Sequence, residues 1–277
     1  MPQTTQIVDG YLPLLAGGGF PAWPLPLDGK GVEVARSAVR AVCGEFGIPS
    51  DLTYDATVIT SELVTNALVH AYQTVRVRPL VGGPEIWAYL SRRAHPEIVI
   101  KIFDSAPWRG PIHHPLLRPP WDAPNGRGLE VVNALTAECG GRWGVHPTRG
   151  RIGAWPTSGK AVFFTLPIPD GSGGALPLSS EPRSPRQSAE RIHALLGARG
   201  LRPQLSADRG MAVICARPGV HVWVREDSLS YRLPGREVVR HPCFDEIEVV
   251  ERVVRHCEEF AEVNGAVGPP PSLDVLR

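Results

Sequence analysis

The chain has 277 residues, 43% of them hydrophobic, which is enough to build one large or two modest globular domains. Its formal net charge is only +1, so the composition excludes a global basic field that would attract nucleic acid or acidic membranes. The five cysteines are odd in number and form no C-x-x-C pair, which argues against a disulfide framework or a zinc site. No apolar run approaches the roughly 18 residues of a membrane span, and we expect a cytoplasmic protein.

A segment rich in Gly, Ser and Pro divides the chain. It runs from Asp170 to Arg186 and has no apolar period, as is typical of a linker. We therefore predict a first domain over residues 18–168, a linker over 169–186, a small second domain over 187–263 and a disordered tail over 264–277.

Apolar spacing predicts the elements of the first domain. A helix is expected over 32–46 and a second over 57–71, each with apolar residues on one stripe. On the second helix, Glu62, Asn66 and His70 fall four residues apart and form a polar row. The remaining expected elements are strands at 85–90 and 98–103, a Pro-rich loop, a helix at about 129–138 and a strand at 160–166.

The second domain is predicted to have the order αβββα. Its helices are expected at 189–199, closed by Gly200, and at 244–263. Three strands lie between them, at 211–216, 221–225 and 229–233, with turn residues in the gaps. Because every one of these elements has an apolar face, we expect this domain to fold independently, with little packing transmitted through the linker.

Three polar clusters of the first domain stand in order along the chain. Glu62 and Asn66 lie one helical turn apart, so a carboxylate able to orient or deprotonate a nucleophile points the same way as an amide oxygen able to ligate Mg²⁺. Asp104 ends an apolar strand, where it can accept a hydrogen bond from an exocyclic amine such as that of adenine. Gly126 and Gly128 open a helix and let backbone amides approach a phosphate. Together these clusters predict a nucleotide site.

The clusters resemble the N, G1 and G2 boxes of the ATPase superfamily that includes gyrase, histidine kinases and mismatch-repair proteins (GHKL). The matching segments are S-E-L-V-T-N-A-L-V-H-A at 61–71, I-F-D-S-A-P at 102–107 and G-R-G-L-E-V-V at 126–132. The chain is most similar to actinobacterial anti-sigma-factor serine kinases, which also show W-G-V-H-P and G-K-x-V-x-F, here at 143–147 and 159–164. The resemblance covers roughly residues 20–167. It implies an α+β fold of the Bergerat type, a helical layer on a mixed sheet, here followed by the small αβββα domain.

The resemblance also implies roles for single residues. Glu62 would be the general base, Asn66 the magnesium ligand and Asp104 the residue that reads adenine. Gly126 and Gly128 would be hinges of a nucleotide lid.

The chain departs from the family pattern at two places. Ala106 stands where the D-x-G box usually has a glycine, which changes the residue at a tight turn. No arginine stands just before the G2 glycines, so Arg118 and Arg127 are both candidates for contact with the γ-phosphate, and we favour Arg127.

By this resemblance the cofactors are ATP and Mg²⁺, and the chain is a serine/threonine-protein kinase that regulates transcription. Its substrate would be a serine of a small anti-anti-sigma (STAS-type) protein, with a sigma factor as the competing client. The alternative is a module that binds ATP and sequesters a sigma factor or other regulator without turnover. We expect neither nucleic acid nor a membrane as a direct partner, and a homodimer stays open.

Overall fold

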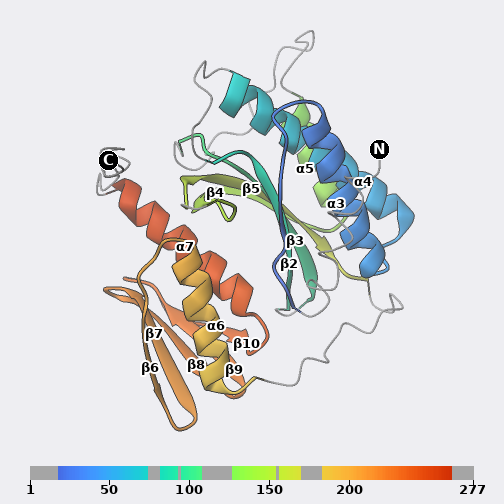
Figure 1. Cartoon of the computed structure of the whole chain (residues 1–277). Helices are drawn as coiled ribbons and strands as arrows, with labels where there is room; N and C mark the ends of the chain where they lie inside the picture. The colour runs from blue at the N-terminus through green and yellow to red at the C-terminus, as the bar shows by residue number, and fades with distance from the viewer. Residues whose placement is uncertain are drawn as a thin grey trace, which may run out of the picture.

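The structure is a computed structural model that describes residues 18–73, 82–92, 95–107, 127–153, 156–169 and 183–263. These residues form two units, before and after residues 170–182, and each unit places helices on a five-stranded sheet (Figure 1). No helix within the described ranges combines the length and the apolar character needed to cross a bilayer.

The first unit has the strand order β1-β2-β3-β5-β4. Its helices are α3 (Lys30–Glu45), α4 (Ser50–Ala67) and α5 (Gly128–Glu138). Its strands are β1 (Ala22–Pro24), β2 (Glu85–Ser91), β3 (Glu97–Asp104), β4 (Trp143–Arg149) and β5 (Ser158–Pro167). The three expected helices and three expected strands are confirmed. All described strand pairs of this sheet are antiparallel, whereas a mixed sheet was expected. At one edge of the sheet, β4 pairs with β5, the next strand along the chain, and is therefore antiparallel to it.

Two strands of this sheet were not predicted. β4 has the sequence W-G-V-H-P-T-R, and Gly and Pro are depleted in strands. The strand nevertheless forms because it lies at the edge of the sheet, where the missing N–H of Pro147 costs no hydrogen bond to a neighbouring strand. β1 is only three residues long and ends in Pro24.

Helix α4 is longer than predicted at its amino end and changes geometry at its carboxyl end. It begins at Ser50, and its hydroxyl side chains bond back to helix carbonyls, as when Thr60 Oγ1 donates to the Ala56 carbonyl at 2.7 Å. After Ala67 the chain continues as a π-helical segment, η1 (Leu68–Gln73). This segment carries His70 and Tyr72 toward the end of β3.

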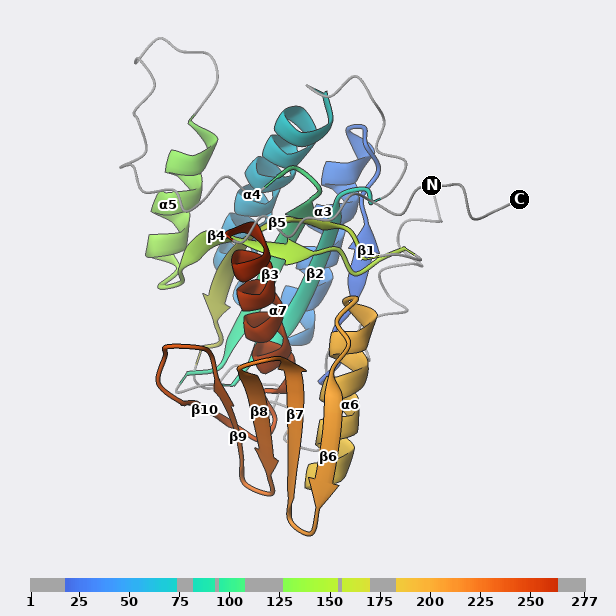
Figure 2. The same cartoon turned by 90° about the vertical axis from the view of Figure 1, so that its left-hand side faces the viewer.

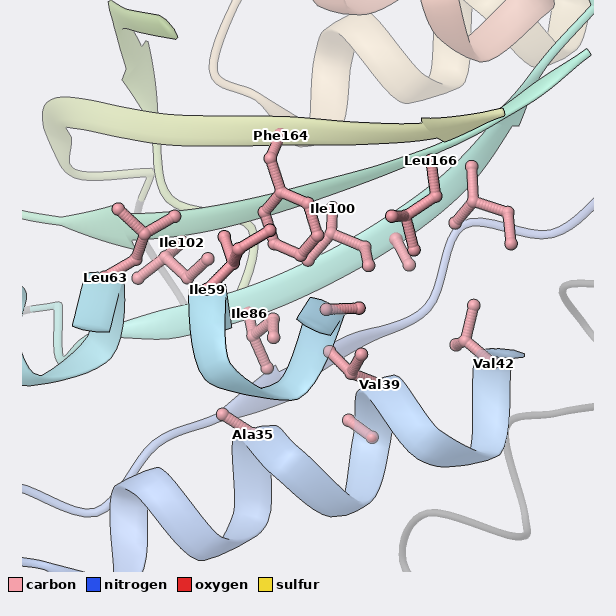
Figure 3. Packing of buried hydrophobic residues seen from close by; sticks show 14 of the residues in the cluster. Ala35, Val39, Val42, Ile59, Leu63, Ile86, Ile100, Ile102, Phe164 and Leu166 are labelled. Atoms are coloured by element: carbon pink, nitrogen blue, oxygen red, sulfur yellow. The ribbon is translucent and has the colours of Figure 1, made fainter. Parts of the chain in front are cut away.

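The main core lies between the helices and one face of the first sheet (Figure 3). Alternate residues of β3, namely Ile98, Ile100 and Ile102, are buried on this face. Other members of the same core are Ala35, Val39 and Val42 from α3, Ile59 and Leu63 from α4, Ile86 from β2, and Phe164 and Leu166 from β5. The intervening β3 residues therefore point to the opposite face.

The second unit has the strand order β10-β9-β8-β7-β6, with α6 and α7 packed on its sheet. Its helices are α6 (Pro185–Ala198) and α7 (Glu246–Val263). Its strands are β6 (Gln204–Asp208), β7 (Met211–Arg217), β8 (Val220–Arg225), β9 (Ser228–Arg232) and β10 (Val239–Pro242). The three central strands are confirmed, but the predicted αβββα order lacks β6 and β10. Both are short, largely polar edge strands without a regular apolar alternation.

Helix α7 also packs against the first sheet, on the face that α3, α4 and α5 leave uncovered (Figures 1 and 2). There Trp87, Tyr89, Val99 and Phe103 form a second apolar cluster with Ile247 of α7. The expectation that little packing passes between the units is therefore wrong. The linker composition contains no information about this contact, because the residues that make it lie outside the linker.

A buried ionic network accompanies this apolar contact. Glu251 of α7 accepts a hydrogen bond from Lys101 Nζ of β3 at 2.8 Å and another from Arg199, and all three side chains are at most 5% exposed. Lys101 Nζ also lies 3.2 Å from Nε2 of His146. Burial lowers the pKa of both Lys101 and His146, although Glu251 opposes the shift at Lys101. The two units are thus joined by charges withdrawn from water.

Candidate functional site

The polar pair on α4 meets the beginning of α5. Glu62 and Asn66 are half-buried, and Gly128 is the first residue of α5. A Cβ atom at Gly128 would lie only 2.6 Å from Oε2 of Glu62 and 3.6 Å from Nδ2 of Asn66. A side chain at this position would have to displace the Glu62 carboxylate, so the glycine lets α5 begin close to the pair without moving it. The structure therefore brings together two of the clusters that the sequence singled out.

The amino end of α5, which is the positive end of its helix dipole, lies beside Glu62 and Asn66. Arg127 precedes the helix, is exposed, and makes no side-chain cap to it. The first backbone N–H groups of a helix and its dipole favour negatively charged groups such as phosphates. Gly126 and Arg118 lie outside the described residues, as does the whole segment 108–126.

Asp104 lies at the carboxyl end of β3 and is only 2% exposed. Its Oδ1 accepts a hydrogen bond from Lys160 Nζ at 2.5 Å, because β3 and β5 place these two residues directly opposite each other. Burial raises the pKa of the Asp104 carboxyl, and Lys160 opposes that shift. A Cβ at Gly159 would lie 2.2 Å from the Asp104 carbonyl oxygen, so the glycine before Lys160 is required for this close approach.

The turn after Asp104 closes although it lacks the usual glycine. The backbone N–H of Ala106 donates to Oδ1 of Asp104 at 2.9 Å, which is a turn that an aspartate forms with the residue two positions on. No non-glycine residue within the described ranges has a positive φ, so Ala106 adopts this turn without left-handed backbone. The replacement of glycine by alanine is compatible with the site.

Tyr72 ties the π-helical segment to this same turn, which the sequence did not predict. Its hydroxyl accepts hydrogen bonds from the backbone N–H of Ser105 at 3.1 Å and from the Ser105 hydroxyl at 3.3 Å. It donates to the carbonyl of Gly82 at 3.4 Å. π-helical turns inside helices often occur at functional sites. In the sequence, Tyr72 directly follows the N box, but this position alone does not indicate its partner. His70, the third member of the predicted polar row, is exposed.

The donor set fits a magnesium-bound nucleotide. Asn66 and Glu62 offer oxygen atoms, which Mg²⁺ prefers, and α5 directs backbone donors to the same place. Within the described ranges no group of three or more His, Cys, Asp or Glu side chains could hold a metal ion by itself. A magnesium ion here would therefore take ligands from the phosphates as well as from the chain, as is usual for Mg²⁺ at nucleotide sites.

A family comparison supports a nucleotide site in the first unit. Residues 25–150 match the family model of the histidine kinase-like ATPase domain. Among solved structures, the chain is similar to the histidine kinase domain of the blue-light activated histidine kinase from Erythrobacter litoralis EL346. The identity is 19% over 60% of this chain and 73% of that chain, and the TM-score is 0.28. The comparison with curated proteins finds no match.

The matched segment runs from the start of the first core to the end of β4, and it contains Glu62, Asn66, Asp104 and Gly128. The first unit places a layer of three helices on one face of its sheet, which is the architecture of an α/β sandwich of the Bergerat type. Residues 25–150 of this chain are therefore similar in sequence to the ATP-binding domain of histidine kinase-like ATPases.

Proposed function

We propose that this chain binds Mg-ATP between α4, the start of α5 and the end of β3, and that it phosphorylates a serine of a partner protein. The observation that carries the proposal is the close approach of Gly128 to Glu62 and Asn66. A Cβ atom at Gly128 would lie within 4 Å of both side chains. Two clusters separated by about 60 residues of sequence meet there, beside the positive end of a helix.

Each residue then has one part in the reaction. Asn66 ligates the magnesium ion, which neutralises phosphate charge when bound, and Asp104 accepts a hydrogen bond from the amino group of adenine. Glu62 accepts the proton of the serine hydroxyl as the serine oxygen bonds to the γ-phosphorus and the bond to the β-phosphate oxygen breaks. Ala106 closes the turn beside Asp104, and Gly126, Gly128 and Arg127 flank the phosphates.

The resemblance to anti-sigma-factor kinases supports a choice of partner. A small anti-anti-sigma (STAS-type) protein would supply the serine, and a sigma factor would be the competing client. Transcription regulation and a cytoplasmic location follow from that choice. The Pro-rich segment between Asp104 and Gly126 favours a second candidate, a module that binds ATP and sequesters the regulator without turnover.

The test is phosphate transfer from radiolabelled ATP by the full-length chain to candidate partners from its own genome, compared between wild type and Glu62→Gln. Glutamine keeps the shape of the side chain but cannot accept a proton at neutral pH. Loss of general-base catalysis is expected to slow transfer by about a hundred- to ten-thousand-fold. ATP affinity is expected to be unchanged or slightly higher, because one negative charge beside the triphosphate is removed.

Glu33→Gln, at an exposed position in the first turn of α3, is the matched control and is expected to transfer at the wild-type rate. If Glu62→Gln transfers phosphate as fast as wild type, the base lies elsewhere. If wild type binds ATP and a partner but transfers no phosphate, and Glu62→Gln binds the partner equally well, the sequestering module is the correct function.

A further inference from the structure

A cavity of about 320 Å³ lies in the second unit, between α7 and the strands β9 and β10. All of its lining residues fall between Tyr231 and Glu259, so it shares none with the candidate ATP site. Its volume is at the lower end of the range of small-molecule pockets, about 300 to 1,000 Å³. The chemistry of its walls indicates what it could hold.

One side of the cavity is basic. Arg252 and Arg255 of α7 line it, and each donates to a carboxylate one turn away, to Glu248 and Glu259 respectively, both at 2.7 Å. Arg236 also lines the cavity, and its guanidinium forms no hydrogen bond or ion pair with any residue in the described ranges. The acidic lining residues are Glu237 and Glu259, so the arginines outnumber the carboxylates by one.

His256 adds a buried polar atom with no partner. It lines the same cavity, and its Nε2 is withdrawn from solvent without a hydrogen bond to any described residue. Burial lowers the pKa of this imidazole, and Arg217 and Arg236 lower it further, whereas Glu259 opposes the shift. Because Nε2 is out of reach of water, a ligand in the cavity would act on this imidazole through its charge and not through a hydrogen bond to Nε2.

The opposite side of the cavity is apolar. Leu233 and Val239 line it and are partly buried against the core of the second unit, and Tyr231 beside them is 5% exposed. Apolar walls of this kind contact the body of a ligand, while a few polar groups fix its orientation.

We propose that this cavity binds a small organic anion. Its carboxylate or phosphate group lies between Arg236 and His256, and its compact apolar body packs against Leu233 and Val239. The Arg236 guanidinium supplies charge-assisted hydrogen bonds to such a group, and the nearby ring of His256 senses its charge. The proposal does not depend on the function of the first unit.

The probes are benzoate and phenyl phosphate, which present a carboxylate and a phosphate on the same ring, and benzamide, which has the shape of benzoate without the charge. Each is titrated into the full-length chain while the pKa of the His256 imidazole is followed by NMR, with His256→Gln used to assign the signal. At least one anion is expected to raise this pKa saturably by about one unit, because a nearby negative charge favours the protonated imidazole. Benzamide is expected to leave it unchanged.

Arg236→Gln is expected to weaken binding of the anion by roughly tenfold, the effect of losing one charge-assisted hydrogen bond. Arg236 is exposed, so this variant should fold and bind ATP as wild type does. Arg225→Gln, at an exposed position at the end of β8, removes the same charge elsewhere and is expected to leave binding unchanged.

Binding of benzoate alone or of phenyl phosphate alone identifies the head group and supports the proposal. The proposal is overturned if neither anion changes the pKa of His256, if benzamide acts equally, or if Arg225→Gln weakens binding as much as Arg236→Gln does.

Discussion

The buried network between the two units makes Glu251 the most informative position for a stability measurement. We expect Glu251→Gln to lower the free energy of unfolding sharply. The substitution keeps the volume of the side chain but removes the negative charge that two buried cations share, Lys101 and Arg199. Both buried cations would then lose the carboxylate to which they donate, although the charge of Glu248 still acts on Lys101.

The expected size follows from the burial. Removing one partner of a buried ion pair typically costs about 3 to 5 kcal/mol. The amide oxygen of glutamine can still accept a hydrogen bond, so we expect the lower end, about 3 kcal/mol. For a chain of this size each kcal/mol lowers the melting temperature by roughly 2 to 4 °C, which gives a decrease of roughly 6 to 12 °C.

The effect should depend on pH in a defined direction. Burial alone would raise the pKa of Glu251, but Arg199 and Lys101 outweigh it and hold that pKa well below its usual range. A carboxyl whose folded pKa is depressed stabilises the protein above its unfolded pKa of about 4.3 and loses that contribution as the pH falls further. The difference between wild type and Glu251→Gln should therefore be full at pH 7 and shrink below about pH 4.

Calorimetric melting and urea denaturation of the full-length chain measure this difference. The matched control is Glu190→Gln, which removes the carboxylate of an exposed pair with Arg186 and should cost less than about 1 kcal/mol. In a Lys101→Met background the loss caused by Glu251→Gln should be smaller, because only Arg199 is left uncompensated. A loss at Glu251 no larger than the loss at Glu190 would refute the buried network.

Three further predictions concern the first unit. Gly128→Ala should weaken ATP binding, because the added Cβ would lie 2.6 Å from Oε2 of Glu62 and displace that carboxylate. The control is Gly44→Ala in α3, where no atom lies within 4 Å of the added Cβ. This variant should bind ATP normally, and its free energy of unfolding should be up to about 1 kcal/mol higher. Calorimetry on both variants tests this, and equal ATP affinity would contradict it. Asp104→Asn should reduce the preference for ATP over GTP, because the charge that strengthens the hydrogen bond to adenine is lost; unchanged selectivity in competition binding would mean that adenine lies elsewhere. Residues 18–168 alone should bind Mg-ATP but melt at a lower temperature than the full chain, because Trp87, Tyr89 and Phe103 lose their cover from α7. A fragment as stable as the full chain would show that this interface contributes nothing.

The sequence by itself determined the elements with a long, regular apolar period. α3 buries Ala35, Val39 and Val42 on one stripe, and β3 alternates Ile98, Ile100 and Ile102 with its other face, so local spacing was sufficient to identify both. The same holds for the order of the polar clusters, since Glu62 and Asn66 lie on α4, which has a similar apolar period, and Asp104 ends β3. The roles of these residues and the domain boundaries at 168 and 187 stay predictions.

Edge strands and contacts between distant residues were decided only by the tertiary structure. β4, with an internal Gly and Pro, and the short polar β6 and β10 form because a neighbouring strand offers hydrogen bonds, not because of their own composition. The contact of Tyr72 with Ser105 and the bond of Lys160 to Asp104 depend on how segments far apart in the chain are placed.

Helix α7 shows most clearly where the sequence is insufficient. Its apolar residues keep helical spacing as far as Phe260, yet Phe260 is 42% exposed and lies against Arg217. Glu248, Glu251 and Glu258, which a sequence pattern places on a solvated face, are instead buried against the first sheet. Glutamates are almost never buried without partners, and these find theirs in Tyr89, Arg252, Lys101, Arg199 and Arg149. Local periodicity reports which face of a helix is apolar, whereas burial of a charged face depends on cations that only the folded chain brings within hydrogen-bond distance.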